Sequence, residues 1–246
     1  MELSPSPVRH DYASALADVK ARVHVAEASC GRAGSGVRVL VATKTWDVDA
    51  AVAVVRAGGV LVGESRMQEL EIKGPALAAA GARIHVIGQL QRNKAATAVR
   101  WADCVQTIDS LALAQRLSRL CVDADRSLDV MIQVNVSGES TKAGIEPEDA
   151  LDFAKTVQGL PALTVTGFMT IGLNSPSESA VRAGYRTLRE IRDQALILSE
   201  RGAADLENAW HLSMGMSGDL EWAIAEGATM VRVGTAIMGT RVTPLI

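Results

Sequence analysis

A lysine directly follows a run of apolar residues that is typical of a buried β-strand. The run reads VRVLVAT, over residues 37–43, and Lys44 comes next. A parallel strand that is covered on both faces has a nearly continuous apolar sequence, and the functional groups of α/β proteins gather where such strands end. A lysine amine can form a Schiff base with a carbonyl compound. Lys44 is therefore a candidate for covalent chemistry; the alternative is a surface lysine that begins a loop.

Two segments near the end of the sequence contain residues that suit a phosphate site. In SMGMSGDLEWAI, a glycine-containing turn precedes a helix that we expect to begin at about Gly218, with Ser217 as its N-cap. The free N–H groups in the first turn of a helix bind phosphate. In RVGTAIMG, Gly234 and Thr235 directly follow the last strand-like run. Alone, each segment could be only a helix cap and a turn; together, opposite a lysine, they favour an aldehyde-bearing phosphate ligand.

Eight strand-like runs alternate with segments of helical spacing, after an N-terminal helix that we expect at about residues 11–28. The runs cover residues 37–43, 60–64, 83–88, 104–108, 128–136, 163–171, 209–214 and 230–234. This order predicts parallel strands joined by right-handed crossovers. We predict an α/β fold, one (β/α)₈ TIM barrel with an extra N-terminal helix, as a single domain over residues 1–246 with a barrel core at about 37–241. An open doubly wound sheet is the alternative, but polar residues follow nearly every strand rather than one crevice, which favours the barrel.

The composition argues against several classes of function. The formal net charge of −3 and the lack of a basic cluster argue against a nucleic-acid or anionic-membrane partner. No apolar run is long enough to span a bilayer, and the N-terminus has no apolar segment typical of a signal peptide. Three widely spaced cysteines, Cys30, Cys104 and Cys121, predict neither a disulfide framework nor a zinc site. We therefore expect a cytoplasmic protein that holds no metal.

Several longer motifs occur in the order that one known family shows. They are VATKT, GESRMQE, HVIGQLQRNK, QVNVSGESTKAG, GFMTIG, HLSMGMSGDLEWAI and MVRVGTAIMGTR, spread over residues 37–241. Together they resemble the pyridoxal-phosphate homeostasis protein family. The resemblance implies a barrel like the N-terminal domain of alanine racemase, with pyridoxal 5′-phosphate (PLP) bound to Lys44 as a covalent aldimine. This sequence departs from the family pattern at Ser65, where Asn is common, and at Gln89, where Pro is common. Both departures concern contacts around the cofactor ring.

The resemblance also assigns the remaining cofactor-binding residues. It implies that the phosphate is held by Ser213, Gly215, Ser217, Gly234 and Thr235. It implies further that Arg232 faces the pyridine nitrogen of the cofactor. A permanently charged guanidinium keeps that nitrogen unprotonated, and the ring is then a poorer electron sink than one paired with a carboxylate.

Racemisation on such a ring needs a second acid or base opposite the lysine. In alanine racemase that group is a tyrosine from a C-terminal β domain, whereas the tyrosines of this sequence are Tyr12 and Tyr185. We therefore expect no catalytic residues, and a PLP carrier or buffer that acts in PLP homeostasis and has apo PLP-dependent enzymes as possible recipients. The alternatives are a weak PLP-dependent amino-acid racemase and a class I aldolase-like enzyme that acts on a phosphorylated sugar without PLP.

Three other residues allow both a functional and an ordinary interpretation. Lys142 stands in the loop after the fifth strand-like run, between Gly138 and Gly144, and could accept the aldehyde transiently as a second amine. The alternative is an exposed loop lysine. For Glu64 we expect a structural hydrogen-bond acceptor, and the alternative is a catalytic role. For His85 we expect a paired histidine in the core, and the alternative is a general base.

Overall fold

Eight parallel strands form a closed barrel in a computed structural model of the chain, which describes residues 10–139 and 143–240. Each strand pairs with the next, and β8 pairs with β1 to close the barrel. The strands are β1 Arg38–Ala42, β2 Leu61–Glu64, β3 Arg83–Val86, β4 Cys104–Ile108, β5 Leu128–Gln133, β6 Leu163–Met169, β7 His211–Ser213 and β8 Met230–Val233. The prediction of a (β/α)₈ barrel is confirmed.

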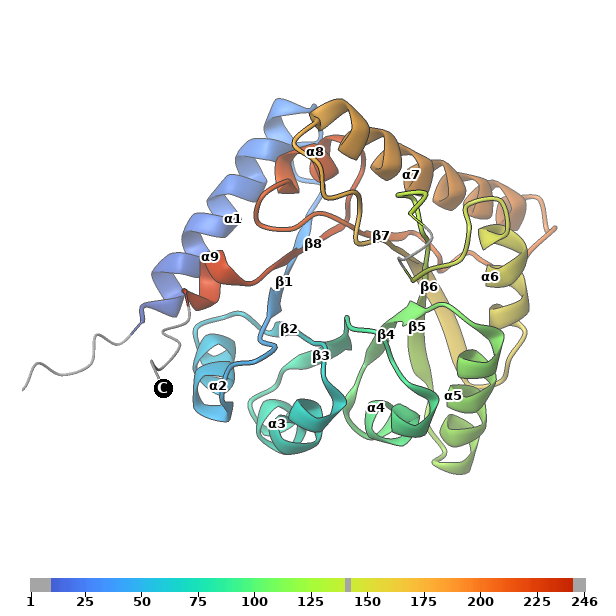
Figure 1. Cartoon of the computed structure of the whole chain (residues 1–246), viewed down its shortest axis with the longest axis horizontal. Helices are drawn as coiled ribbons and strands as arrows, with labels where there is room; N and C mark the ends of the chain where they lie inside the picture. Colours follow the sequence, from blue (N-terminus) through green and yellow to red (C-terminus); the bar gives the residue numbers. More distant parts are fainter. Residues whose placement is uncertain (1–9, 140–142, 241–246) are drawn as a thin grey trace, which may run out of the picture.

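Helices surround the strands, and α1 lies beside α8 and α9 (Figure 1). The helix α1 is the predicted extra N-terminal helix, and the side chain of Asp11 caps it by accepting a hydrogen bond from the N–H of Ser14. The helices are α1 Tyr12–Ser29, α2 Val48–Arg56, α3 Met67–Ala79, η1 Arg92–Lys94, α4 Ala95–Trp101, α5 Leu111–Asp123, α6 Ala150–Gln158, α7 Glu178–Glu200, α8 Leu220–Ala225 and α9 Thr235–Met238.

Most strands end earlier than the sequence predicts. The fifth was expected to continue to Val136, but β5 ends at Gln133 and only an isolated bridge joins Val134 to Ile145. The seventh was expected over residues 209–214, and β7 is the shorter His211–Ser213. Apolar character therefore continues beyond the last ladder hydrogen bond, into the loops that form the C-terminal face of the barrel.

Alternate residues of each strand face the helices and the barrel interior. On the outside, one large apolar core joins strands to helices and includes Val41 and Val231. Inside, Leu40 of β1 packs with Leu61 and Met230 in a separate small cluster. The interior is too narrow at this level for a side chain on β2 at residue 63, because a Cβ on Gly63 would lie 2.4 Å from Leu40 Cδ2. This alternation fixes which strand-end residues face the site.

Three further features concern membrane spans, metal ligands and cysteines. Among the described helices, none combines the length and the apolar character needed to cross a membrane. No group of three or more His, Cys, Asp or Glu side chains in residues 10–139 and 143–240 could hold a metal ion. The three cysteines are free thiols, and Cys104 and Cys121 are buried.

Candidate cofactor-binding site

Lys44 lies in the turn that directly follows β1, at the C-terminal face of the barrel. The turn is closed by a hydrogen bond of 3.2 Å from the N–H of Trp46 to the carbonyl of Thr43. Lys44 stands two residues after Ala42, the last residue of β1. Its side chain is exposed, and no described carboxylate lies within ion-pair distance of it.

A second lysine near this turn offers a direct contrast. Lys73 of α3 is buried, and its Nζ donates to the carbonyl of Thr43 at 2.9 Å, to Glu64 Oε1 at 3.0 Å and to Glu69 Oε2 at 3.1 Å. An ammonium has three N–H donors, and all three are used here. Of the two lysines that reach this turn, Lys44 is therefore the one with an accessible amine.

Arg232 of β8 is buried, and its guanidinium is fixed by the two strands that precede it. Its Nη1 donates to Ser213 Oγ at 2.9 Å and to the carbonyl of Ser213 at 2.8 Å, and its Nη2 donates to the carbonyl of Thr170 at 2.8 Å. Burial lowers the pKa of Arg232 to about 10, against the opposing effect of Tyr185 and Asp219. The guanidinium is still charged at neutral pH, and it points in a set direction at the barrel mouth.

A chain of hydrogen bonds continues from Arg232 into the barrel. Ser213 Oγ donates to Gln106 Oε1 at 2.7 Å, and Gln106 Nε2 lies 2.7 Å from His85 Nδ1. Burial first, and then the positive charge of nearby arginines, lowers the pKa of His85 to about 3. The ring is therefore neutral, and its Nδ1 accepts from Gln106, which agrees with the expected paired core histidine.

These hydrogen bonds bear on the predicted role of Ser213 in phosphate binding. Its hydroxyl already has a donor, Arg232, and an acceptor, Gln106, so it contacts the arginine rather than the loops that follow β7 and β8. Its assignment to the phosphate stays a prediction. Sequence reasoning missed Gln106 and the carbonyl of Thr170. A signal for Gln106 exists, since it is a polar residue in the otherwise apolar run CVQTI.

The loop between β7 and α8 differs from its predicted form. The helix α8 begins at Leu220, and Asp219, not Ser217, occupies its N-cap position. The Asp219 carboxylate instead accepts a hydrogen bond of 2.6 Å from the N–H of Met216 and one of 2.5 Å from the hydroxyl of Tyr185. These two bonds close the turn ahead of the helix, which moves the helix start by two residues. Ser217 as an N-cap is therefore wrong.

The same loop nevertheless presents amide groups that could bind an anion. Among the described residues, no acceptor pairs with the N–H groups of Ser217 and Gly218. Gly215 precedes them with a φ of +88°, and a Cβ there would lie 2.4 Å from Ala223 Cβ. The close packing of this turn on α8 thus requires glycine at residue 215.

The loop after β8 also presents amide N–H groups that could bind an anion. Thr235 is exposed and begins the short helix α9, where the N–H groups of Ile237 and Met238 both donate to the carbonyl of Gly234. In the described part of the chain, the N–H groups of Thr235 and Ala236 have no acceptor. A Cβ built on Gly234 would lie 3.6 Å from Ala42 Cβ, so this loop lies beside the strand that leads to Lys44.

These groups form one arrangement on one face of the barrel. Unpaired amide N–H groups from two neighbouring loops can bind a phosphate, because each amide needs an acceptor. An exposed amine stands beside them at Lys44, and a charged guanidinium is fixed at Arg232. This set of donors fits a small ligand that combines a phosphate with an aldehyde.

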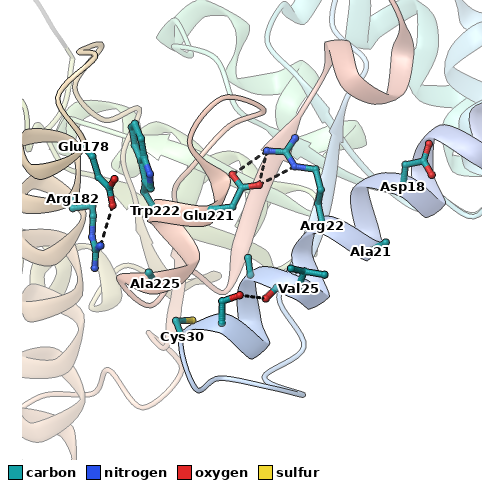
Figure 2. A pocket seen from close by; sticks show the side chains of 12 residues that line it. Asp18, Ala21, Arg22, Val25, Cys30, Glu178, Arg182, Glu221, Trp222 and Ala225 are labelled. Carbon is teal, nitrogen blue, oxygen red and sulfur yellow. Dashed lines mark hydrogen bonds and ion pairs between the residues drawn. The ribbon is translucent and has the colours of Figure 1, made fainter.

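A groove outside the barrel lies behind the loop that contains Ser217. It has a volume of about 740 Å³ and is lined by residues of α1, α7 and α8. Figure 2 shows Arg22 and Glu221 pointing toward one another. Arg22 Nη2 lies 2.7 Å from Glu221 Oε1. Arg22 also donates to the carbonyl of Ser217 at 3.2 Å, so α1 holds the back of this loop. None of the residues predicted for the site lines the groove.

Lys142, the predicted second amine, lies outside the described residues. The tyrosines are both described. Tyr185 is buried, its hydroxyl donates to Asp219, and burial together with that carboxylate raises its pKa. Tyr12 begins α1 and lies edge-on to His10.

Comparison with known proteins places the chain in a family. The sequence matches the alanine racemase N-terminal domain over residues 15–242. Pyridoxal phosphate homeostasis proteins of Vibrio cholerae and Pseudomonas aeruginosa are 38% and 39% identical to it over 227 residues. The matches cover 91% and 92% of this chain, and 93% and 94% of the two relatives. The chain belongs to the pyridoxal phosphate homeostasis protein family.

A solved structure resembles the barrel described above. PipY of Synechococcus elongatus, with PLP bound, is 28% identical and superposes with a TM-score of 0.79, over 93% of this chain and 100% of PipY. The resemblance that the motifs indicate is thus confirmed.

Proposed function

We propose that the chain binds PLP through the amine of Lys44 and acts as a PLP carrier or buffer in intracellular PLP homeostasis. One observation carries the proposal most directly. The unpaired N–H groups of the loops after β7 and β8 lie on the same barrel face as the exposed amine of Lys44. The names of the relatives and the PLP in PipY support it independently.

Different residues bind the phosphate, the aldehyde and the ring of the cofactor. The amide groups around Ser217 and Thr235 bind the phosphate, Lys44 supplies the amine that holds the aldehyde, and Arg232 faces the ring. When bound, PLP supplies a reactive aldehyde on an electron-withdrawing ring. A fixed positive charge from Arg232 opposes protonation of the ring nitrogen and so weakens that withdrawal. The result is a site suited to retaining the cofactor rather than to using it.

The tyrosines support a carrier over a racemase. A racemase with two bases needs an ionisable group opposite the lysine, with a pKa near the working pH. The hydroxyl of Tyr185 is buried against Asp219, which raises its pKa, and Tyr12 lies at the start of α1. Burial and the charge of Asp47 raise the pKa of Tyr12 as well, so neither phenol has the pKa near neutral that such a base needs. We therefore propose no catalytic residue for this chain. We propose that it acts in the cytoplasm and that apo PLP-dependent enzymes receive the cofactor from it.

Transfer of the cofactor tests the proposal. The purified protein is loaded with PLP, freed of excess, and mixed with an apo PLP-dependent enzyme whose recovery of activity is followed. A carrier restores activity, and the same protein turns over neither D- nor L-amino acids. Sustained racemisation by the wild-type protein, removed by Lys44→Ala, would favour the weak racemase instead. Absence of PLP binding would contradict both.

A further inference from the structure

A buried ionic cluster on α3 and β2 holds the backbone on both sides of Lys44. We propose that Glu69, Lys73 and Glu64 are positioning residues for the Lys44 amine, acting through the peptide groups of Thr43 and Thr45. The inference rests on the proposed function, because it concerns how the PLP-binding lysine is held.

The residue before Lys44 is fixed from the helix side of the barrel. The side chain of Thr43 is fully buried and donates to Glu64 Oε1 at 2.7 Å. Its carbonyl accepts the 2.9 Å hydrogen bond from Lys73 Nζ. One carboxylate and one ammonium therefore hold both the side chain and the backbone of Thr43.

The residue after Lys44 is fixed by the same cluster. The N–H of Thr45 donates to Glu69 Oε2, the oxygen that also accepts from Lys73. Thr45 has a φ of +70°, a left-handed conformation that is costly for a β-branched residue. Such a conformation persists only where the surroundings impose it. Within the turn, the Thr45 hydroxyl donates to the carbonyl of Lys44, and the hydrogen bond to Glu69 is the contact that comes from outside the turn.

The chemistry of the cluster argues for a positioning role rather than for stability. Glu64 and Lys73 are buried, and Glu64 Oε2 has no partner within the described residues. Burial raises the pKa of Glu64 against the opposing charge of Lys73. Apolar residues of similar volume often stabilise a protein as well as a buried ion pair does. An apolar cluster, however, could not hold the carbonyl of Thr43 and the N–H of Thr45.

The conformation of the Lys44 turn affects how tightly the ligand binds. When the turn is held, the amine of Lys44 starts from one backbone position, on the same barrel face as the loops proposed to bind the phosphate. When the turn is free to adopt other conformations, only part of the population can bind, and the apparent dissociation constant rises by the inverse of that fraction.

Variants of Glu69 test the proposal, because this side chain is partly exposed and its loss leaves Lys73 and Glu64 paired. We expect Glu69→Ala to raise the dissociation constant for PLP about tenfold, and to make amide exchange at Thr45 much faster in the protein without PLP. Glu69→Gln keeps an oxygen that can accept from both Thr45 and Lys73, so it should restore most of the affinity and the protection. Glu71→Ala is the matched control, because it removes a carboxylate from the same helix whose one ion-pair partner among the described residues is Arg100, at the surface.

Each outcome separates this inference from the proposed function. If the wild-type protein fails to bind PLP, the proposed function is wrong whatever the Glu69 variants do. If the wild type binds PLP and Glu69→Ala binds it equally well, the positioning role is wrong. Rapid amide exchange at Thr45 in the wild-type protein would overturn it without any variant. Equal losses of affinity in Glu69→Ala and Glu71→Ala would overturn it as well.

Discussion

At the scale of single residues, the site depends on which polar groups are already paired. Lys44 follows β1, and Lys73 of α3 reaches the same turn. Three acceptors surround the Nζ of Lys73, whereas the side chain of Lys44 is exposed. The same distinction separates Ser213, whose hydroxyl is paired twice, from Thr235, which is exposed. Whether a side chain is available to a ligand therefore depends more on its existing hydrogen bonds than on its residue type.

Thr235→Ala should weaken PLP binding without preventing it. A hydrogen bond to a charged group is worth roughly 1.5–3 kcal/mol, and about 1.4 kcal/mol corresponds to a tenfold change in affinity. Titration followed by the absorbance of the bound cofactor should give a dissociation constant raised about tenfold or more. Thr187→Ala, which removes a hydroxyl from the surface of α7, should leave it unchanged. Equal affinity of the wild type for pyridoxal and for PLP would contradict phosphate recognition.

At the scale of elements, short connections join the site to the surrounding helices. The helix α3 reaches the Lys44 turn through Lys73, and α1 reaches the Ser217 loop through Arg22. On the outside, α7 is joined to the end of α8 by three arginines, Arg182, Arg186 and Arg189, which all contact the buried carboxylate of Glu226. The helices therefore position the loops through a few polar contacts as well as through apolar packing.

The contact between α7 and α8 should make stability depend on acid pH. Burial raises the pKa of Glu226, but hydrogen bonds from Arg182 and Arg186 outweigh it, and the pKa is lowered overall. A carboxylate with a lowered pKa stabilises the fold above its unfolded pKa of about 4.3, and the contribution is lost as the pH falls through the folded value. Chemical denaturation should therefore show stability falling below about pH 4.3, and less steeply in Glu226→Gln. An equal change in Glu190→Gln, an exposed residue of α7, would contradict this assignment.

The turn between β7 and α8 should tolerate a methyl group at one glycine and not at another. Gly215→Ala places a Cβ 2.4 Å from Ala223 Cβ at a φ of +88°, whereas a Cβ on Gly218 has no neighbour within 4 Å. We expect Gly215→Ala to lower the free energy of unfolding by about 2–4 kcal/mol, from strain and overpacking. Gly218→Ala should change it by less than about 1 kcal/mol. Similar unfolding midpoints for both variants would show that the turn adapts.

At the scale of the whole molecule, periodicity and order predict the barrel but not the contacts inside it. Alternating strand and helix patterns predict eight parallel strands, and β4 is found at the expected residues, 104–108. The same patterns place Lys44 and Thr235 at strand ends. They could not predict that Arg232 donates to the carbonyl of Thr170, or that Lys73 holds Thr43, because these partners are 62 and 30 residues apart in sequence. The start of α8 was misplaced for a related reason, since the carboxylate of Asp219 bonds to Met216 and Tyr185 instead of capping the helix.

The central claim is that Lys44 holds the cofactor, and reductive trapping tests it most directly. The protein loaded with PLP is treated with borohydride, digested, and its peptides are analysed by mass spectrometry. We expect the cofactor to be attached to the peptide containing Lys44, and Lys44→Ala to lose both this adduct and the visible absorbance of the bound cofactor. Lys155→Ala, which removes a surface amine from α6 that pairs with Asp152, should retain both. Attachment to another lysine, or full absorbance in Lys44→Ala, would contradict the account.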